Sequence, residues 1–204
     1  AEGEPSVVRF KTPTEGETVV HDLIRGDVTF SNTILNDYVL LKSDGYPTYH
    51  LANVVDDHEM RVTHIMRADE WISSTPLHVM LYDAFGWTPP AFAHLPMILG
   101  PDKSKLSKRH GATTVTEYRE QGYLPEALFN FLALLGWALD DKTELFTRDE
   151  LVAAFSLERV GKTAAVFNMP KLDWMNGVYI RGLTREAFAQ RALPYLERDL
   201  PASV

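Results

Sequence analysis

A short basic run, KLSKR at Lys105–Arg109, has the clearest potential for chemistry in this sequence. It follows the turn-forming residues Gly100–Asp102 and is followed closely by Gly111. Lysines three residues apart in such a loop can place their compact ammonium charges on the oxygens of a triphosphate, and Ser107 adds a hydroxyl group. These five residues alone leave open a solvated basic loop that binds nothing.

The charge distribution of the chain points to the same loop. The 204 residues carry a net charge of −8, yet four cations and a histidine lie within Lys103–His110. Because the chain as a whole is acidic, it is not a basic nucleic-acid module whose entire surface attracts phosphate. A polyanion would have to bind locally, and this loop carries the positive charge to bind it.

The composition excludes several other kinds of site. Hydrophobic residues make up 45% and aromatic residues 11% of the chain, as in globular proteins with real cores. There is no Cys, and hence no disulfide, thiolate metal site or thiol nucleophile. There is no apolar run of about 18 residues, so a soluble segment without a membrane partner is expected. Asp56–Glu59 invites a metal site, but consecutive helical side chains diverge, and no metal is predicted there.

Alternating strand and helix patterns lead up to the basic loop. Strands are expected at Tyr38–Lys42 and Val62–Arg67, with a helix over residues 49–59 between them that Thr48 caps. Such a strand–helix–strand unit should be right-handed with parallel strands.

A second helix and strand follow. The helix is expected over Pro76–Phe85, with Thr75 as N-cap and Gly86 as stop. The strand is expected over Phe92–Leu99, and Pro96 places it toward an edge of the sheet.

Outside this region the pattern predicts short strands near the start and only helices after about Glu117. These elements are Val7–Lys11 and Val28–Ser31 as strands, and Pro125–Leu135, Arg148–Phe155 and Thr184–Tyr195 as helices. The C-terminal third is therefore expected to be a small helical domain.

The most polar segments of the chain follow predicted strands. They are Ser43–Tyr49, Arg67–Trp71 and Gly100–Arg109. In an open parallel sheet the ligand crevice lies beyond the carboxyl ends of the strands, so these segments should meet there.

Arg67 ends a predicted buried strand and should face this crevice. Its planar guanidinium can hold a carboxylate through two parallel hydrogen bonds. An uncharged amide in place of that carboxylate would leave the guanidinium poorly paired, at a cost of a few kcal/mol. The alternative is a local ion pair with Asp69 or Glu70.

Three separate blocks agree with one known family in order and spacing. The blocks are Lys42–His58 (KSDGYPTYHLANVVDDH), Arg67–Pro76 (RADEWISSTP) and Lys105–Arg109 (KLSKR). Together they resemble bacterial glutamyl-tRNA synthetases, which are class I aminoacyl-tRNA synthetases. The resemblance continues through Gly122–Ala127 (GYLPEA) and Lys171–Gly177 (KLDWMNG), so it covers most of residues 20–190.

The resemblance implies an α/β fold with a parallel sheet. Residues 1–37 would end the acceptor-end-binding insertion, 38–116 would form the second half of a Rossmann-type catalytic domain, and 117–204 an all-α stem-contact domain. The family's ATP-binding motif of the His-x-Gly-His type is absent, as are the first Rossmann half and the anticodon-binding domain. We therefore expect truncated ends, a segment that is inactive alone, and a cytoplasmic parent enzyme.

The family also implies which residues bind the substrates. The lysines of the loop would stabilise the α-phosphate region as the amino-acid carboxylate attacks it and pyrophosphate leaves, which makes Lys105 and Lys108 the catalytic residues. Implied ATP contacts are Lys105, Ser107, Lys108, Arg109, Glu70 and Trp71, and implied glutamate contacts are Tyr49, Asn53 and Arg67.

The implied reaction is the ATP-dependent activation of L-glutamate and its transfer to the 3′ end of tRNA(Glu). Mg²⁺ would accompany ATP, with no metal bound by this segment itself. The partners would be L-glutamate, ATP, tRNA(Glu) and the remainder of the synthetase chain. Two alternatives stay open: a catalytically inert tRNA-binding module and a glutaminyl-type synthetase. A base-modifying relative fits less well, because such relatives lack the lysine motif.

Overall fold

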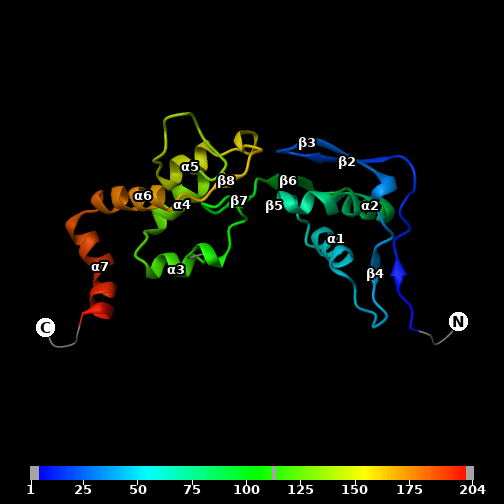
Figure 1. Cartoon of the computed structure of the whole chain (residues 1–204), viewed down its shortest axis with the longest axis horizontal. Coiled ribbons are helices and arrows are strands. Elements are labelled where there is room, and N and C mark those ends of the chain that lie inside the picture. Colours follow the sequence, from blue (N-terminus) through cyan, green and yellow to red (C-terminus); the bar gives the residue numbers. More distant parts are fainter. Residues whose placement is uncertain (1–4, 112–113, 201–204) are drawn as a thin grey trace. The chain divides into compact units, whose positions relative to one another are not determined.

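The computed structural model describes residues 5–111 and 114–200. Contacts divide the chain into two compact units, residues 1–96 and 97–204, each of which is described by itself (Figure 1). The first unit contains parallel strands and helices, and the second is mostly helical. The predicted α/β fold class is confirmed.

A four-stranded sheet organises the first unit. Its order is β3 (Gly26–Ser31), β2 (Glu17–Asp22), β6 (Ala91–Leu95) and β5 (His64–Ala68). The hairpin β2–β3 is antiparallel, whereas β6 runs parallel to both β2 and β5. The helix α2 (Thr75–Phe85) connects β5 to β6 and completes a strand–helix–strand unit.

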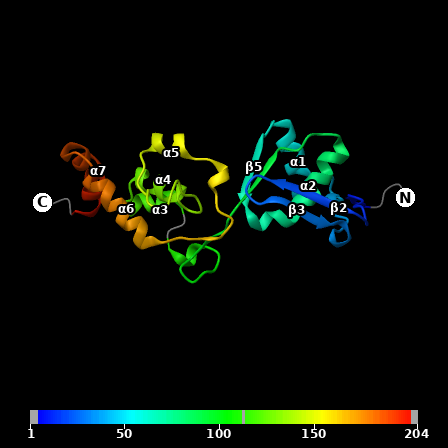
Figure 2. The ribbon, with the colours of Figure 1, turned by 90° about the horizontal axis from the view of Figure 1, so that it is seen from above.

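Two helices cover the sheet of the first unit. The helix α2 packs against β2, and α1 (Tyr49–Glu59) packs against α2, so α2 lies between the sheet and α1 (Figure 2). Val54 of α1 and Leu77, Leu81 and Tyr82 of α2 form a buried cluster. This cluster holds α1 against α2.

Both helices have the expected bounds to within one residue. The helix α1 follows Thr48, although the Thr48 hydroxyl donates to the Val39 carbonyl at 2.7 Å and does not cap the helix. The helix α2 starts at Thr75 after Ser74, and it stops at Gly86, whose φ of 70° suits glycine.

The strand pairing predicted for Tyr38–Lys42 is wrong. That segment forms β4 (Val39–Leu41), which pairs antiparallel with β1 (Val8–Arg9) in a separate two-stranded ladder. A tight turn returns the chain so that Thr48 N donates to the Leu40 carbonyl at 2.8 Å. These partners satisfy the backbone of β4 outside the main sheet, and the parallel partner of β5 is β6 instead.

The predicted strand Phe92–Leu99 is two strands. The first, β6, is central in the sheet and not at its edge, while β7 (Ile98–Leu99) belongs to the second unit. Pro96 lies between them, so its missing N–H interrupts neither ladder. The strand β2 was not predicted from the sequence at all.

Helices form most of the second unit. They are α3 (Val115–Glu120), α4 (Pro125–Ala133), α5 (Arg148–Ala154), α6 (Met169–Arg181) and α7 (Arg185–Asp199). Short 3₁₀ helices also occur in both units. In the described residues the first unit contains η1 (Asn32–Ile34) and η2 (Asp69–Ser74), and the second contains η3 (Lys108–His110) and η4 (Leu157–Arg159).

One short strand departs from the all-α expectation after Glu117. The strand β8 (Ala165–Val166) pairs in parallel with β7. This ladder ties the start of the basic loop to the helical core, which is formed by Tyr118, Leu128, Phe131, Phe167, Leu172 and Met175. Within the described ranges, 5–111 and 114–200, no helix is long and apolar enough to cross a membrane.

Candidate functional site

Arg67 is held at the sheet by two neutral hydrogen-bond acceptors. It lies on β5 directly across from His94 of β6. Its Nε donates to His94 Nε2 at 3.2 Å, and its Nη2 donates to Thr75 Oγ1 at 2.9 Å. The guanidinium carbon lies 5.7 Å from the centre of the Trp71 ring, which adds a cation–π contact. The arginine is therefore fixed on more than one side.

A buried carboxylate lies behind His94. The Asp22 Oδ2 atom is 2.6 Å from His94 Nδ1 and also accepts from His94 N at 3.0 Å. The other oxygen, Oδ1, accepts from the backbone N–H groups of Ile24 and Arg25. Burial alone would raise the pKa of Asp22, but these hydrogen bonds hold it below its ordinary value. Burial lowers the pKa of His94, so the imidazole is neutral.

Arg67 has no carboxylate partner within ion-pairing distance in residues 5–111 and 114–200. Asp69, one of the two alternative partners, pairs with Arg25 at 2.7 Å. Burial lowers the pKa of Arg67, while the Tyr49 hydroxyl opposes that shift. A half-buried cation whose hydrogen-bond partners are neutral is a site for an anionic group.

Tyr49 and Trp71 form an aromatic surface beside this cation. Tyr49 begins α1, Trp71 lies in η2, and their ring centres are 5.4 Å apart. Tyr49 is 51% exposed and Trp71 38% exposed, so both rings are open to a ligand. Two of the segments expected to meet, Ser43–Tyr49 and Arg67–Trp71, are thus together.

Asn53 lies one turn after Tyr49 on α1. Its Oδ1 atom is buried and has no hydrogen-bond partner in the described part of the chain. Burial raises the pKa of the neighbouring Asp57, whereas the Arg67 charge and the Asn53 amide act to lower it. Asn53 and Arg67 thus both lie near Asp57. Glu70 is exposed in η2, three residues beyond Arg67.

Sequence reasoning missed the buried polar residues that support Arg67. They are Asp22, His94 and Thr75, together with a histidine pair in which His50 Nδ1 lies 2.9 Å from His78 Nε2. His78 is fully buried, and burial lowers its pKa to about 3. Polar residues within apolar strands and helices were the signal that could have identified them.

The basic loop Gly100–Gly111, named here the lysine loop, is built on local backbone turns. Gly100 N donates to the Ser104 carbonyl at 2.8 Å, and Leu106 N donates to the Ile98 carbonyl at 3.0 Å. The Leu106 side chain packs against the helical core and anchors the loop there. Lys103 adopts a φ of 62° at the tip of the turn.

A polar cluster organised by His110 braces the lysine loop. The Asp102 Oδ1 atom accepts from Ser104 N at 3.0 Å, from Ser104 Oγ at 2.7 Å and from His110 Nε2 at 3.2 Å. The serine hydrogen bonds, followed by that of His110, hold the pKa of Asp102 far below its usual value. A Cβ atom at Gly100 would lie 2.7 Å from the His110 ring, so only glycine fits there.

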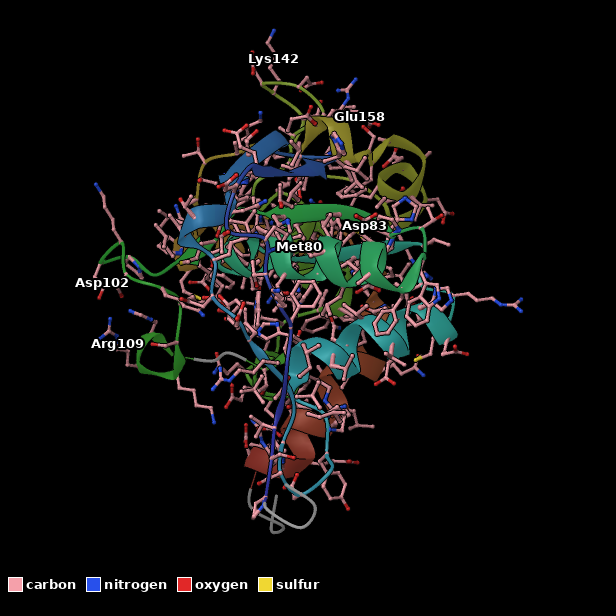
Figure 3. All side chains as sticks on the ribbon, turned by 90° about the vertical axis from the view of Figure 1, so that its right-hand side faces the viewer. Met80, Asp83, Asp102, Arg109, Lys142 and Glu158 are labelled. Atoms are coloured by element: carbon pink, nitrogen blue, oxygen red, sulfur yellow. The ribbon has the colours of Figure 1, made fainter. Side chains whose placement is uncertain are left out.

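The predicted ATP residues of the loop differ in their surroundings. Lys105, Ser107 and Lys108 are exposed. Arg109 is also exposed, but its Nη2 donates to Ser104 Oγ at 2.6 Å and lies 3.5 Å from Asp102 Oδ2 (Figure 3). Arg109 therefore braces the loop, and its contact with ATP stays a prediction, as do those of the lysines.

Residues that could bind a metal are scattered. In the part of the chain that the structure describes, no group of three or more His, Asp or Glu side chains has the arrangement of a metal site. The convergence of the lysine loop with the other two polar segments stays a prediction.

The sequence profile and the curated relatives that match this chain all belong to the same family. Residues 1–174 match the sequence profile described as tRNA synthetases class I (E and Q), catalytic domain. The glutamate–tRNA ligase of Dehalococcoides mccartyi is 64% identical over 197 residues, which are 97% of this chain and 40% of that protein. The Treponema pallidum enzyme of the same name is 55% identical over 197 residues, covering 96% of this chain and 37% of that protein.

A solved structure agrees with these relatives. The crystal structure of a glutamate tRNA ligase from Elizabethkingia meningosepticum, in complex with its amino acid, has a TM-score of 0.88 and 42% identity. The match covers 98% of this chain and 43% of that one. The chain thus spans about 40% of the length of the curated relatives it matches. On this sequence and structural similarity, the chain belongs to the class I tRNA synthetases of the E and Q type, through their catalytic domain.

Proposed function

We propose that the chain contributes part of the active site of a glutamate–tRNA ligase. The reaction is the activation of L-glutamate by ATP to glutamyl-adenylate, followed by transfer of the glutamyl group to the 3′ end of tRNA(Glu). The observation that carries this proposal is Arg67, a half-buried cation held by neutral groups and without a carboxylate partner in the described residues.

Arg67 selects the side-chain carboxylate of glutamate. Its guanidinium offers paired N–H groups that match two carboxylate oxygens. Tyr49 and Asn53 contact the rest of the amino acid, and the unpartnered Asn53 amide oxygen can accept from an ammonium group. Glutamine offers no negative charge, so it leaves the arginine desolvated and unneutralised.

The lysine loop provides charge for the nucleotide. Lys108 and Lys105 stabilise the negative charge that develops on phosphate oxygens as the glutamate carboxylate attacks and pyrophosphate leaves. Ser107 and Arg109 complete the phosphate contacts, and Glu70 and Trp71 contact the adenosine. Mg²⁺ bound with ATP supplies further charge neutralisation, and it fits this chain as an ion held mainly by substrate phosphates.

The wider organisation follows the family. Residues 1–37 end the acceptor-end-binding insertion, 38–116 belong to the Rossmann-type catalytic domain, and 117–204 contact the tRNA stem. The partners are L-glutamate, ATP, tRNA(Glu) and the remaining parts of a cytoplasmic synthetase.

Pyrophosphate exchange tests the proposal. The protein at its full natural length, with tRNA present, should exchange labelled pyrophosphate into ATP when L-glutamate is added. Glutamine should support this exchange at least ~10²-fold less well, as a buried charge without its partner predicts. Equal exchange with glutamine would favour a glutaminyl-type enzyme. Salt-dependent tRNA binding without any amino-acid-dependent exchange would favour an inert tRNA-binding module.

A further inference from the structure

We propose that Asp22 and His94 are positioning residues for Arg67, which present it to the substrate as a fixed and still unneutralised cation. This inference rests on the proposed role of Arg67 in binding glutamate. It extends that role to two residues on other strands, β2 and β6, which hold the arginine from behind.

The hydrogen bonds fix the proton on one nitrogen of His94. Asp22 is ionised, so its Oδ2 atom can only accept, and His94 Nδ1 must donate across the 2.6 Å separation. The imidazole is neutral, which leaves Nε2 with a lone pair and no proton. That lone pair accepts from Arg67 Nε at 3.2 Å. Asp22 thereby determines that the atom facing Arg67 is an acceptor.

The two bonds to Arg67 occupy one edge of the guanidinium. Nε is used by His94, and one hydrogen of Nη2 is used by Thr75 Oγ1 at 2.9 Å. His94 and Thr75 leave the hydrogens of Nη1 and the second hydrogen of Nη2 unused, and the Tyr49 hydroxyl also hydrogen-bonds the guanidinium. Two N–H groups at that end suit a two-pronged carboxylate. The support therefore orients the group without using its binding edge.

A neutral support also preserves the charge of Arg67. A carboxylate in place of His94 would pair with the arginine and compete with the substrate, while a protonated histidine would repel it. The negative charge of Asp22 is instead stabilised by hydrogen bonds from four N–H groups. Three are the backbone N–H groups of Ile24, Arg25 and His94, and the fourth is His94 Nδ1–H. Asp22 thus controls Arg67 through the imidazole.

Two substitutions of His94 separate positioning from folding. His94→Gln can return an amide oxygen toward Arg67 Nε, whereas His94→Leu is similar in bulk but removes the acceptor. In the full-length protein, His94→Leu should raise KM for glutamate about tenfold or more, as the loss of one hydrogen bond to a charged group predicts. KM for ATP should stay within about twofold, and His94→Gln should recover most of the glutamate affinity.

The outcomes distinguish this inference from the proposed function. If Arg67→Ala abolishes glutamate-dependent exchange while His94→Leu leaves KM for glutamate unchanged, Arg67 binds glutamate but the positioning inference fails. An equal rise in both KM values, without recovery in His94→Gln, would mean a structural role and would also overturn it. If the unaltered protein shows no exchange with glutamate, the proposed function itself fails.

A spectroscopic measurement tests the support without any activity. Long-range ¹H–¹⁵N spectra of the imidazole should show the His94 proton on Nδ1 in the unaltered protein. A proton on Nε2 in the unaltered protein would contradict the inference.

Discussion

The Arg67 site and the lysine loop present positive charge in opposite ways. Arg67 is half-buried and is fixed by side chains from two further elements, β6 and α2. Lys108 is exposed on a loop whose cluster at Asp102, Ser104 and His110 braces the backbone. Arg67 is oriented by two side-chain acceptors, whereas Lys108 lies exposed at the surface of its loop.

This difference matches two tasks. Distinguishing a carboxylate from an amide requires a desolvated cation at a fixed position, since a flexible one could adapt to either ligand. In the proposed function the loop lysines stabilise charge that develops on phosphate oxygens, which requires their ammonium groups to lie against those oxygens once ATP is bound. We therefore expect substitutions at Arg67 and its supports to alter selectivity and stability, and substitution of the exposed Lys108 to alter chiefly the rate.

The largest expected effect is on catalysis. Lys108→Ala should lower kcat for glutamate-dependent exchange about 10²- to 10³-fold, the loss seen when one charge-stabilising donor is removed from an active site. The free energy of unfolding should be unchanged because Lys108 is exposed. Lys142→Ala, in the exposed turn labelled in Figure 3, provides the control and should leave kcat unaltered. A normal kcat in Lys108→Ala would remove the loop from the chemical step.

Next in size is a stability effect that should be confined to the Arg67 site. Thr75→Val keeps the shape of the side chain but leaves Arg67 Nη2 without its acceptor, so the free energy of unfolding should fall by about 1–3 kcal/mol in urea titrations. Ser74→Ala removes a neighbouring, more exposed hydroxyl that also bonds the Trp71 carbonyl, and it should cost less. Equal costs for the two variants would argue that Thr75 stabilises η2 and not the arginine.

A pH effect should also be specific to the first unit. The pKa of His78 is lowered from 6.5 to about 3 in the folded chain, so the unfolded chain binds a proton first as pH falls. Its contribution to stability is complete above pH 6.5 and is lost between about pH 6.5 and 3, with a slope of about 1.4 kcal/mol per pH unit. His78→Gln should reduce the slope by that amount in urea titrations. The exposed His64→Gln should retain it.

Local patterns predicted the elements that carry the site, but not their supports. The helices α1 and α2 and the stop at Gly86 follow from apolar spacing and end signals, and the family motifs identified Tyr49 and Arg67 as candidates. The pairing of Asp22 with His94 joins residues 72 positions apart, so it depends on β2 lying beside β6. A single sequence does not encode that register in any local pattern.

The same limit explains the errors in strand pairing. Residues 39–41 have the composition of a sheet strand, yet their hydrogen bonds go to β1 and to the turn at Pro47 and Thr48. The lysine loop was easier to predict because its turns, its glycines and its basic run are all contiguous in sequence.

Steady-state kinetics of Arg67→Gln and Lys108→Ala, measured side by side, test the contrast between the Arg67 site and the lysine loop most directly. KM for glutamate, KM for ATP and kcat would be measured for both variants of the full-length protein. Arg67→Gln should raise KM for glutamate about 10²-fold or more and remove the preference over glutamine, with little change in KM for ATP. Lys108→Ala should chiefly lower kcat. Retention of the glutamate preference in Arg67→Gln, or the same pattern of change in both variants, would contradict the division of roles between the two regions.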